Sequence, residues 1–76
     1  MTTVEPTAVL IKANFDQECV HLARDLHHDG GIKSVIVRPV PVILHELEYY
    51  ERIARRTEAA NPPGLADDFT AWVRTG

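Results

Sequence analysis

Two prolines inside an apolar, β-branched stretch limit how this chain can fold more than any other feature. Residues 32–44 read IKSVIVRPVPVIL, a composition that favours β-strand. Pro39 and Pro41 lack the backbone N–H that a central strand or a helix interior uses for hydrogen bonding. The stretch is therefore neither one central strand nor one helix.

Two interpretations of this stretch remain open. In the first, residues 34–37 and 40–44 pair as a β-hairpin around a tight Arg38-Pro39 turn. In the second, residues 32–38 form one strand, and Pro41 lies in the first turn of the next helix, where a missing N–H is tolerated.

The flanking segments predict a short strand and three helical elements. Residues 8–11 form an apolar run, and an amphipathic helix is expected from about Asn14 or Asp16 to His28. The apolar positions of that helix are Phe15, Cys19, Leu22, Ala23 and Leu26. A long helix is expected over residues 43–60, and the prolines and glycine of residues 61–64 end it. We expect a small single α+β domain: a short N-terminal strand, a helix, a β-hairpin or strand, a long helix and an amphipathic helical tail.

The chain is short, so association with a second copy is expected to complete its core. A 76-residue chain buries only about 60% of the surface that it exposes when unfolded. Cys19 is the single cysteine, which excludes an internal disulfide. We expect a homodimer formed by residues 1–60 through the sheet and one seam of the long helix: Ile43, Leu47, Tyr50 and Ala54.

Metal and enzyme chemistry have little support in the sequence. His21, Asp25 and His28 share one helix face, which leaves a metal site there as an open question. Their spacing matches no recognised zinc motif, so we expect no metal and no cofactor. Neither Ser34 nor Cys19 belongs to a nucleophile motif, and no glycine-rich phosphate loop is present, so we expect a protein that is not an enzyme.

Charge and hydropathy bear on location and partners. The net charge is −3, which argues mildly against broad nucleic-acid binding but allows a local basic patch. There is no apolar run of about 18 residues and no positively charged leader before an apolar segment. We expect a cytoplasmic protein without a membrane span.

The C-terminal segment, residues 61–76, is expected to be a partner-binding tail. Its large apolar side chains fall at i, i+4, i+7 and i+8: Leu65, Phe69, Trp72 and Val73. One helical stripe would carry all four, and an isolated helix of about ten residues is marginal in water. We expect them to be exposed or loosely held in the free protein and buried by a partner. The alternative is that the tail folds back onto its own domain.

Several short motifs resemble those of Phd/YefM-type antitoxins. They are Met1-Thr2-Thr3-Val4, Lys12-Ala13-Asn14-Phe15, VIVRPVPVIL over residues 35–44, and Leu47-Glu48-Tyr49-Tyr50-Glu51-Arg52-Ile53. The sequence departs from the family pattern by an apparent insertion, Val9-Leu10-Ile11, and by a hairpin turn without glycine. A ribbon-helix-helix antitoxin is a weaker alternative, because its second helix would contain Pro39 and Pro41.

The resemblance implies a dimeric transcriptional regulator that binds operator DNA through its N-terminal half and neutralises a toxin protein through its tail. Lys12 and Arg38 take the positions of the family's basic residues, and Lys33 is a further cation of the same half. The alternative function is an adaptor or inhibitor that binds a larger protein, without binding DNA and without enzymatic activity.

Overall fold

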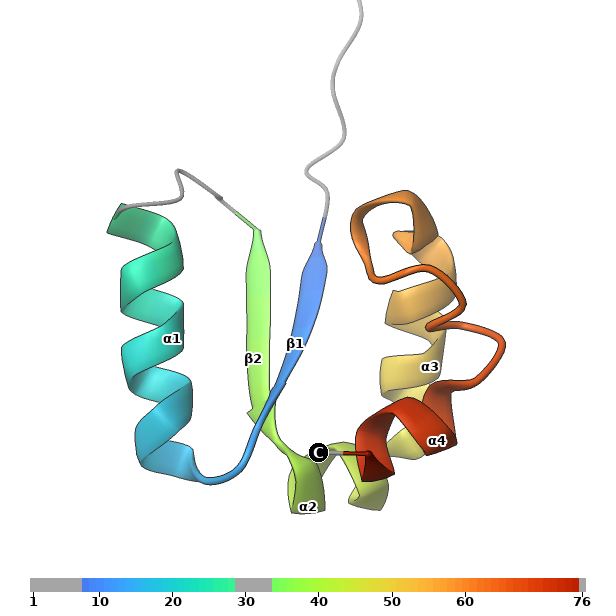
Figure 1. Ribbon diagram of the computed structural model, residues 1–76, viewed down its shortest axis with the longest axis horizontal. Coiled ribbons are helices and arrows are strands. Elements are labelled where there is room, and N and C mark those ends of the chain that lie inside the picture. Colours follow the sequence, from blue (N-terminus) through green and yellow to red (C-terminus); the bar gives the residue numbers. More distant parts are fainter. Residues whose placement is uncertain (1–7, 29–33, 76) are drawn as a thin grey trace, which may run out of the picture.

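The protein combines a two-stranded parallel sheet with helices on both of its faces (Figure 1), and the expected α+β fold class is confirmed. The computed structural model describes residues 8–28 and 34–75. In chain order the elements are β1 (Val9–Ala13), α1 (Asp16–His28), β2 (Val35–Pro39), α2 (Val40–His45), α3 (Leu47–Arg56), the 3₁₀ segment η1 (Glu58–Ala60) and α4 (Phe69–Arg74). Helix α1 covers one face of the sheet, and α3 and α4 lie on the other.

The two strands run parallel, so the β-hairpin interpretation is wrong. The interpretation of one strand followed by a helix at Pro41 is confirmed, with the strand at Val35–Pro39; residues 32 and 33 of the expected strand lie outside the described residues. The register pairs Val9 with Val35 and Ala13 with Pro39. Parallel strands need a long crossover, and α1 supplies it. Pro39 ends β2, and Pro41 lies in the first turn of α2, where no intrahelical partner is expected for its nitrogen.

The long helix expected over residues 43–60 is interrupted. The backbone leaves helical geometry at Glu46, where φ is −118° and ψ is 49°, and this separates α2 from α3. A second departure at Thr57 leads into η1. Neither position carries the glycine or proline that usually marks a helix break in a sequence.

The C-terminal segment forms part of the core, so the expectation that its side chains are exposed or loosely held is wrong. Leu65 is 1% exposed, Phe69 2% and Val73 0%, and Trp72 packs against them half-buried. The segment packs on the side of the sheet that α3 covers (Figure 1). The physical reason is that α3 alone does not cover the apolar side chains on its side of the two-stranded sheet. The C-terminal segment of the same chain covers the rest.

The residues expected at a dimer seam lie in the same core. Ile43, Tyr50 and Ala54 are buried, and Leu47 is half-buried beside them. Leu10 of β1 completes the cluster from the sheet side. These side chains therefore already have partners within one chain.

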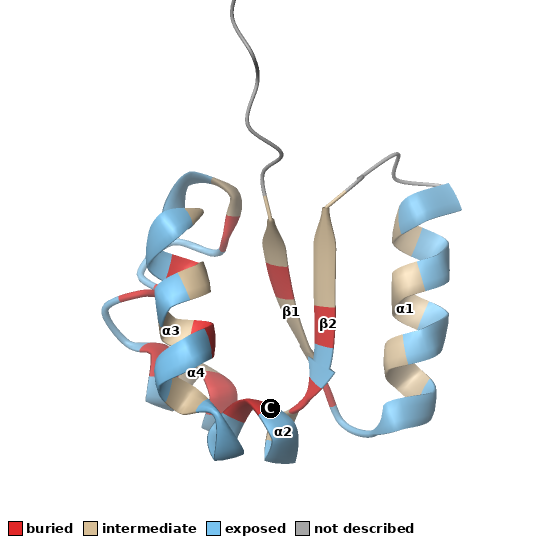
Figure 2. Ribbon diagram, turned by 180° about the vertical axis from the view of Figure 1, so that it is seen from behind, coloured by how far each residue is buried: buried red, intermediate tan, exposed pale blue. Residues whose placement is uncertain are grey.

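Helix α1 is less buried than α3 and α4. None of its residues is fully buried, and its apolar face, formed by Cys19, Leu22, Ala23 and Leu26, is half-buried (Figure 2). Phe15, expected on that apolar face, precedes the helix and is 57% exposed. The face packs on alternate strand residues such as Val37, which is buried.

Side chains and a proline block individual backbone positions on both outer edges of the sheet. Val9 donates its N–H to the carbonyl of Ser34, so in β1 the backbone groups of Leu10 point away from β2. There the Leu10 N–H is bound by Oδ1 of Asn61. On the opposite edge the Val37 carbonyl accepts from Arg38 Nη1, and the following Pro39 has no N–H to offer.

Candidate functional site

Lys12, expected to contact nucleic acid, is engaged within the chain. Its ammonium donates to the backbone carbonyl of Trp72 and, at 3.1 Å, to the hydroxyl of Thr75. It also lies 4.9 Å from the centroid of the Trp72 ring, a cation–π distance. Because the C-terminal end of a helix carries partial negative charge, this cation stabilises the end of α4 against β1.

Arg38 is also engaged, although it lies opposite Lys12 in the strand register. Its Nε donates to the hydroxyl of buried Tyr50 at 3.1 Å, and its Nη1 donates to the Val37 carbonyl at 2.8 Å. The two cations therefore share one face of the sheet but serve different elements, α4 and α3. Lys33, the third expected cation, lies outside the described residues.

The histidine face of α1 forms no metal centre among the described residues. No group of three potential ligands is found in residues 8–28 and 34–75. The imidazole of His21 lies 3.1 Å from the Arg24 guanidinium. Burial, together with the nearby carboxylate of Asp16, raises the pKa of the Cys19 thiol, although Arg38 acts in the opposite direction. The thiol is thus held in its less reactive, protonated form.

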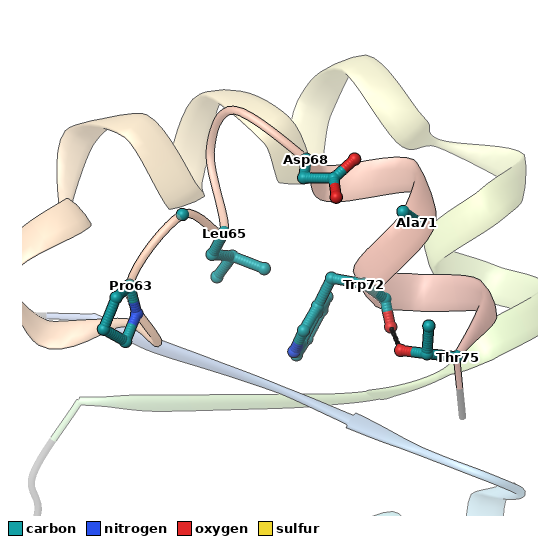
Figure 3. A pocket seen from close by; sticks show the side chains of 7 residues that line it. Pro63, Leu65, Asp68, Ala71, Trp72 and Thr75 are labelled. Atoms are coloured by element: carbon teal, nitrogen blue, oxygen red, sulfur yellow. Dashed lines mark hydrogen bonds between the residues drawn. The ribbon is translucent and has the colours of Figure 1, made fainter.

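One open hollow lies beside Trp72, with a volume of about 260 Å³ (Figure 3). The indole forms one wall, Leu65 and Pro63 lie on the other side, and Thr75 closes one end by donating to the Trp72 carbonyl at 2.9 Å. The polar groups here mainly serve the fold, since Thr75 also accepts from Lys12.

A surface of different character lies around α2, which we call the α2 patch. It consists of exposed apolar side chains from three elements or their ends: Phe15, Pro41, Val42, Leu44 and Tyr49. Phe15 is 57% exposed and Tyr49 54%, while Val42 and Leu44 are each 37% exposed. Figure 2 shows α2 largely exposed at the end of the molecule where α1 begins.

The patch arises because α2 contains more apolar residues than the fold buries. The run from residue 39 to 44 is entirely apolar, yet within α2 Ile43 alone is fully buried. Burying Ile43 turns the following Leu44 outward, because successive residues of a helix are 100° apart. The patch could have been suspected from the sequence, since one short helix cannot bury apolar residues around its whole circumference.

Two open hollows flank the patch. One has a volume of about 270 Å³ and lies between the start of α1 and α2, with Phe15, Pro41 and Val42 in its lining. The other has a volume of about 380 Å³ at the junction of α2 and α3, where Leu44 and Tyr49 line it. The patch therefore has a shallow depression at each end of α2, one at its start and one at its junction with α3.

Carboxylates predominate at the rim of these hollows. Asp16 lines the first, and Glu46 and Glu48 line the second. The described residues that line the two hollows include no lysine or arginine, and the one side chain among them that can become cationic is His45, at the second hollow. The patch thus pairs apolar side chains with a rim that is mostly acidic.

Among the helices of the described residues, none has the length and apolar character needed to span a bilayer. Comparison with known proteins found no matching family model, no matching curated protein and no matching solved structure.

Proposed function

We propose that this chain is a non-enzymatic protein-binding module, an adaptor or inhibitor that docks on a larger protein through the α2 patch. The observation that carries the proposal is the exposure of large apolar side chains on and around α2, above all Phe15 and Tyr49. Clustered exposed apolar side chains with a polar rim are typical of protein interaction sites. Aromatic side chains are also frequent anchors at such interfaces.

The placement of the other candidate side chains supports the same proposal. The tail residues expected to bind a partner, such as Phe69, are buried in the core. Lys12 and Arg38 are hydrogen-bonded within the chain. The patch residues, in contrast, can be covered by a partner without breaking any part of the core.

Position-specific photo-crosslinking in the native host tests the proposal. Replacing Phe15 or Tyr49 by p-benzoylphenylalanine keeps an aromatic side chain, while Val20, 63% exposed on α1 and outside both hollows, is the control position. The expected result is one larger protein joined from positions 15 and 49 but not from 20. The purified partner should then bind the chain and lose affinity for a Val42→Ser variant. Equal adducts from all three positions, or none from the patch, would contradict the proposal.

The antitoxin-like regulator implied by the motif resemblance is a second proposal. Operator binding would use Lys12 and Arg38, and toxin binding would use residues 61–76, so both would require the present contacts to open. An electrophoretic shift with the gene's own promoter distinguishes the two proposals. A shift that Lys12→Ala and Arg38→Ala each weaken would favour the regulator.

A further inference from the structure

We propose that the α2 patch recognises a basic amphipathic helix, which places apolar side chains in the two hollows and lysine or arginine side chains against the acidic rim. This inference rests on the proposed function and adds to it the chemistry of the partner. Helices that dock this way present apolar residues at i, i+3, i+4 and i+7. The hollows at the two ends of α2 provide two places for such residues.

Charge complementarity selects a basic partner. Asp16 stands at the hollow beside Phe15, and Glu46 and Glu48 stand at the hollow beside Tyr49. Their carboxylates attract cations at the rim of an apolar contact and repel an acidic partner. Glu18 adds further negative charge near the first hollow, where its carboxylate accepts from the backbone and side chain of Asn14.

The sheet edge favours a helix over an extended strand as the partner's form. A strand would add to the edge of β2 by bonding its outward backbone groups. Near the patch this edge is blocked, because Arg38 occupies the Val37 carbonyl and Pro39 lacks an N–H. Recognition at this end of the molecule therefore depends on side chains.

A second copy of this chain fits the patch less well. Two copies joined through their patches would bring the carboxylates of both rims together.

The first part of the test uses three synthetic helical peptides with one leucine-rich apolar face and a polar face of lysine, glutamine or glutamate. Each is titrated into the isotope-labelled full chain while amide shifts are followed. The lysine peptide should bind about tenfold more tightly than the glutamate peptide at low salt, with the glutamine peptide between them. Its shifts should centre on Phe15, Val42 and Tyr49, and the preference should shrink as salt is added.

Matched variants separate the apolar contribution from the charge. The double variant Phe15→Ser/Val42→Ser should weaken binding of all three peptides, while Val20→Ser should not. Neutralising the rim with Asp16→Asn, Glu46→Gln and Glu48→Gln should remove most of the preference for lysine. A control that neutralises the exposed Asp25, Glu58 and Asp68 has the same net charge and should retain the preference.

The outcomes that overturn the inference are distinct from those that overturn the proposed function. Equal affinity for the three peptides, binding centred on the hollow beside Trp72, or no binding at all would each overturn the basic-helix inference. Concentration-dependent shifts at the patch without peptide would also overturn it, in favour of a second copy. If crosslinking from positions 15 and 49 still joins one larger protein, the protein-binding function stands.

Discussion

The backbone N–H of Leu10 donates a hydrogen bond of 2.9 Å to Oδ1 of Asn61, which lies 51 residues later in the chain. The side-chain amide of Asn61 in turn donates from Nδ2 to the carbonyl and hydroxyl oxygens of Thr57, at 2.9 and 2.8 Å. Asn61, only 7% exposed, therefore joins the outer edge of β1 to the end of α3. One side chain satisfies a strand edge and fixes where the C-terminal segment begins.

Asn61→Ala should destabilise the fold by about 2–3 kcal/mol, because it leaves the Leu10 N–H without a partner in a buried position. Asn61→Asp should also destabilise at neutral pH, because its carboxylate would face the Thr57 carbonyl. Urea denaturation measures both free energies of unfolding. Gln17→Ala, at an exposed position, is the control and should change stability by less than about 0.5 kcal/mol. Equal effects of Asn61→Ala and the control would show that the bridge has no energetic role.

A matched tyrosine pair tests the contact between β2 and α3. Tyr50→Phe removes the hydroxyl that accepts from Arg38 Nε and keeps the buried ring, so a loss of about 0.5–1.5 kcal/mol is expected. Tyr49→Phe makes the same chemical change on a ring that is 54% exposed and should be nearly neutral. Thermal unfolding of the two variants makes the comparison, and an equal loss of stability in both would contradict the contact.

Lys12 is expected to stabilise the end of α4. Lys12→Gln should lower the free energy of unfolding by about 1 kcal/mol. This is less than the loss expected for a fully buried charged hydrogen bond, because the ammonium is partly exposed to solvent. The emission of Trp72, which loses the neighbouring cation, should change in the folded variant. Arg24→Gln removes one exposed cation from α1 and should leave both observables unchanged. A Trp72 spectrum identical to that of the unmodified protein would argue against the cation–π contact.

The sequence predicted the elements whose signals are local. Pro39 and Pro41 limited residues 32–44 to two arrangements, and the strand followed by a Pro41-initiated helix is the one observed. The choice between them depended on α1 serving as a crossover, which is a tertiary property. The break at Glu46 could not be predicted, because neither it nor its neighbours carry a helix-breaking residue.

The side-chain roles were harder to predict because they depend on contacts distant in sequence. The stripe of Phe69 and Val73 correctly indicated an amphipathic segment, but amphipathicity alone does not say whether the covering surface is the chain's own or a partner's. Lys12 meets Trp72 sixty residues away, which no local pattern reveals. The apolar run over residues 39–44 indicates that α2 has exposed apolar side chains, but which of them point outward depends on Ile43 taking the buried position.

Cys19 should react slowly with alkylating reagents. Burial and the carboxylate of Asp16 raise the pKa of its thiol, so at pH 8 less thiolate is present in the folded chain than in the unfolded chain. The folded state binds the thiol proton more tightly than the unfolded state does. The free energy of unfolding should therefore fall as the pH rises from the thiol's pKa in the unfolded chain towards its higher pKa in the folded chain. Iodoacetamide labelling measures the rate, with the urea-unfolded protein as reference. Faster labelling of the folded chain would contradict the expected direction.

The most direct test of the C-terminal segment is Phe69→Ala, compared with Thr70→Ala. Phe69 is 2% exposed and packs at a centroid distance of 5.9 Å from Trp72, so its loss should cost about 3–5 kcal/mol. The neighbouring Thr70 is exposed, and its substitution should stay within about 0.5 kcal/mol. Removing all residues after Asn61 deletes three large buried side chains, Leu65, Phe69 and Val73, worth roughly 1.5–3 kcal/mol each, as well as the buried Ala66. Because a domain's total stability is only about 5–15 kcal/mol, the truncated chain should be unfolded by circular dichroism and amide dispersion. A truncated chain that keeps a cooperative unfolding transition would show instead that residues 8–61 fold alone and that the tail is free to serve a partner.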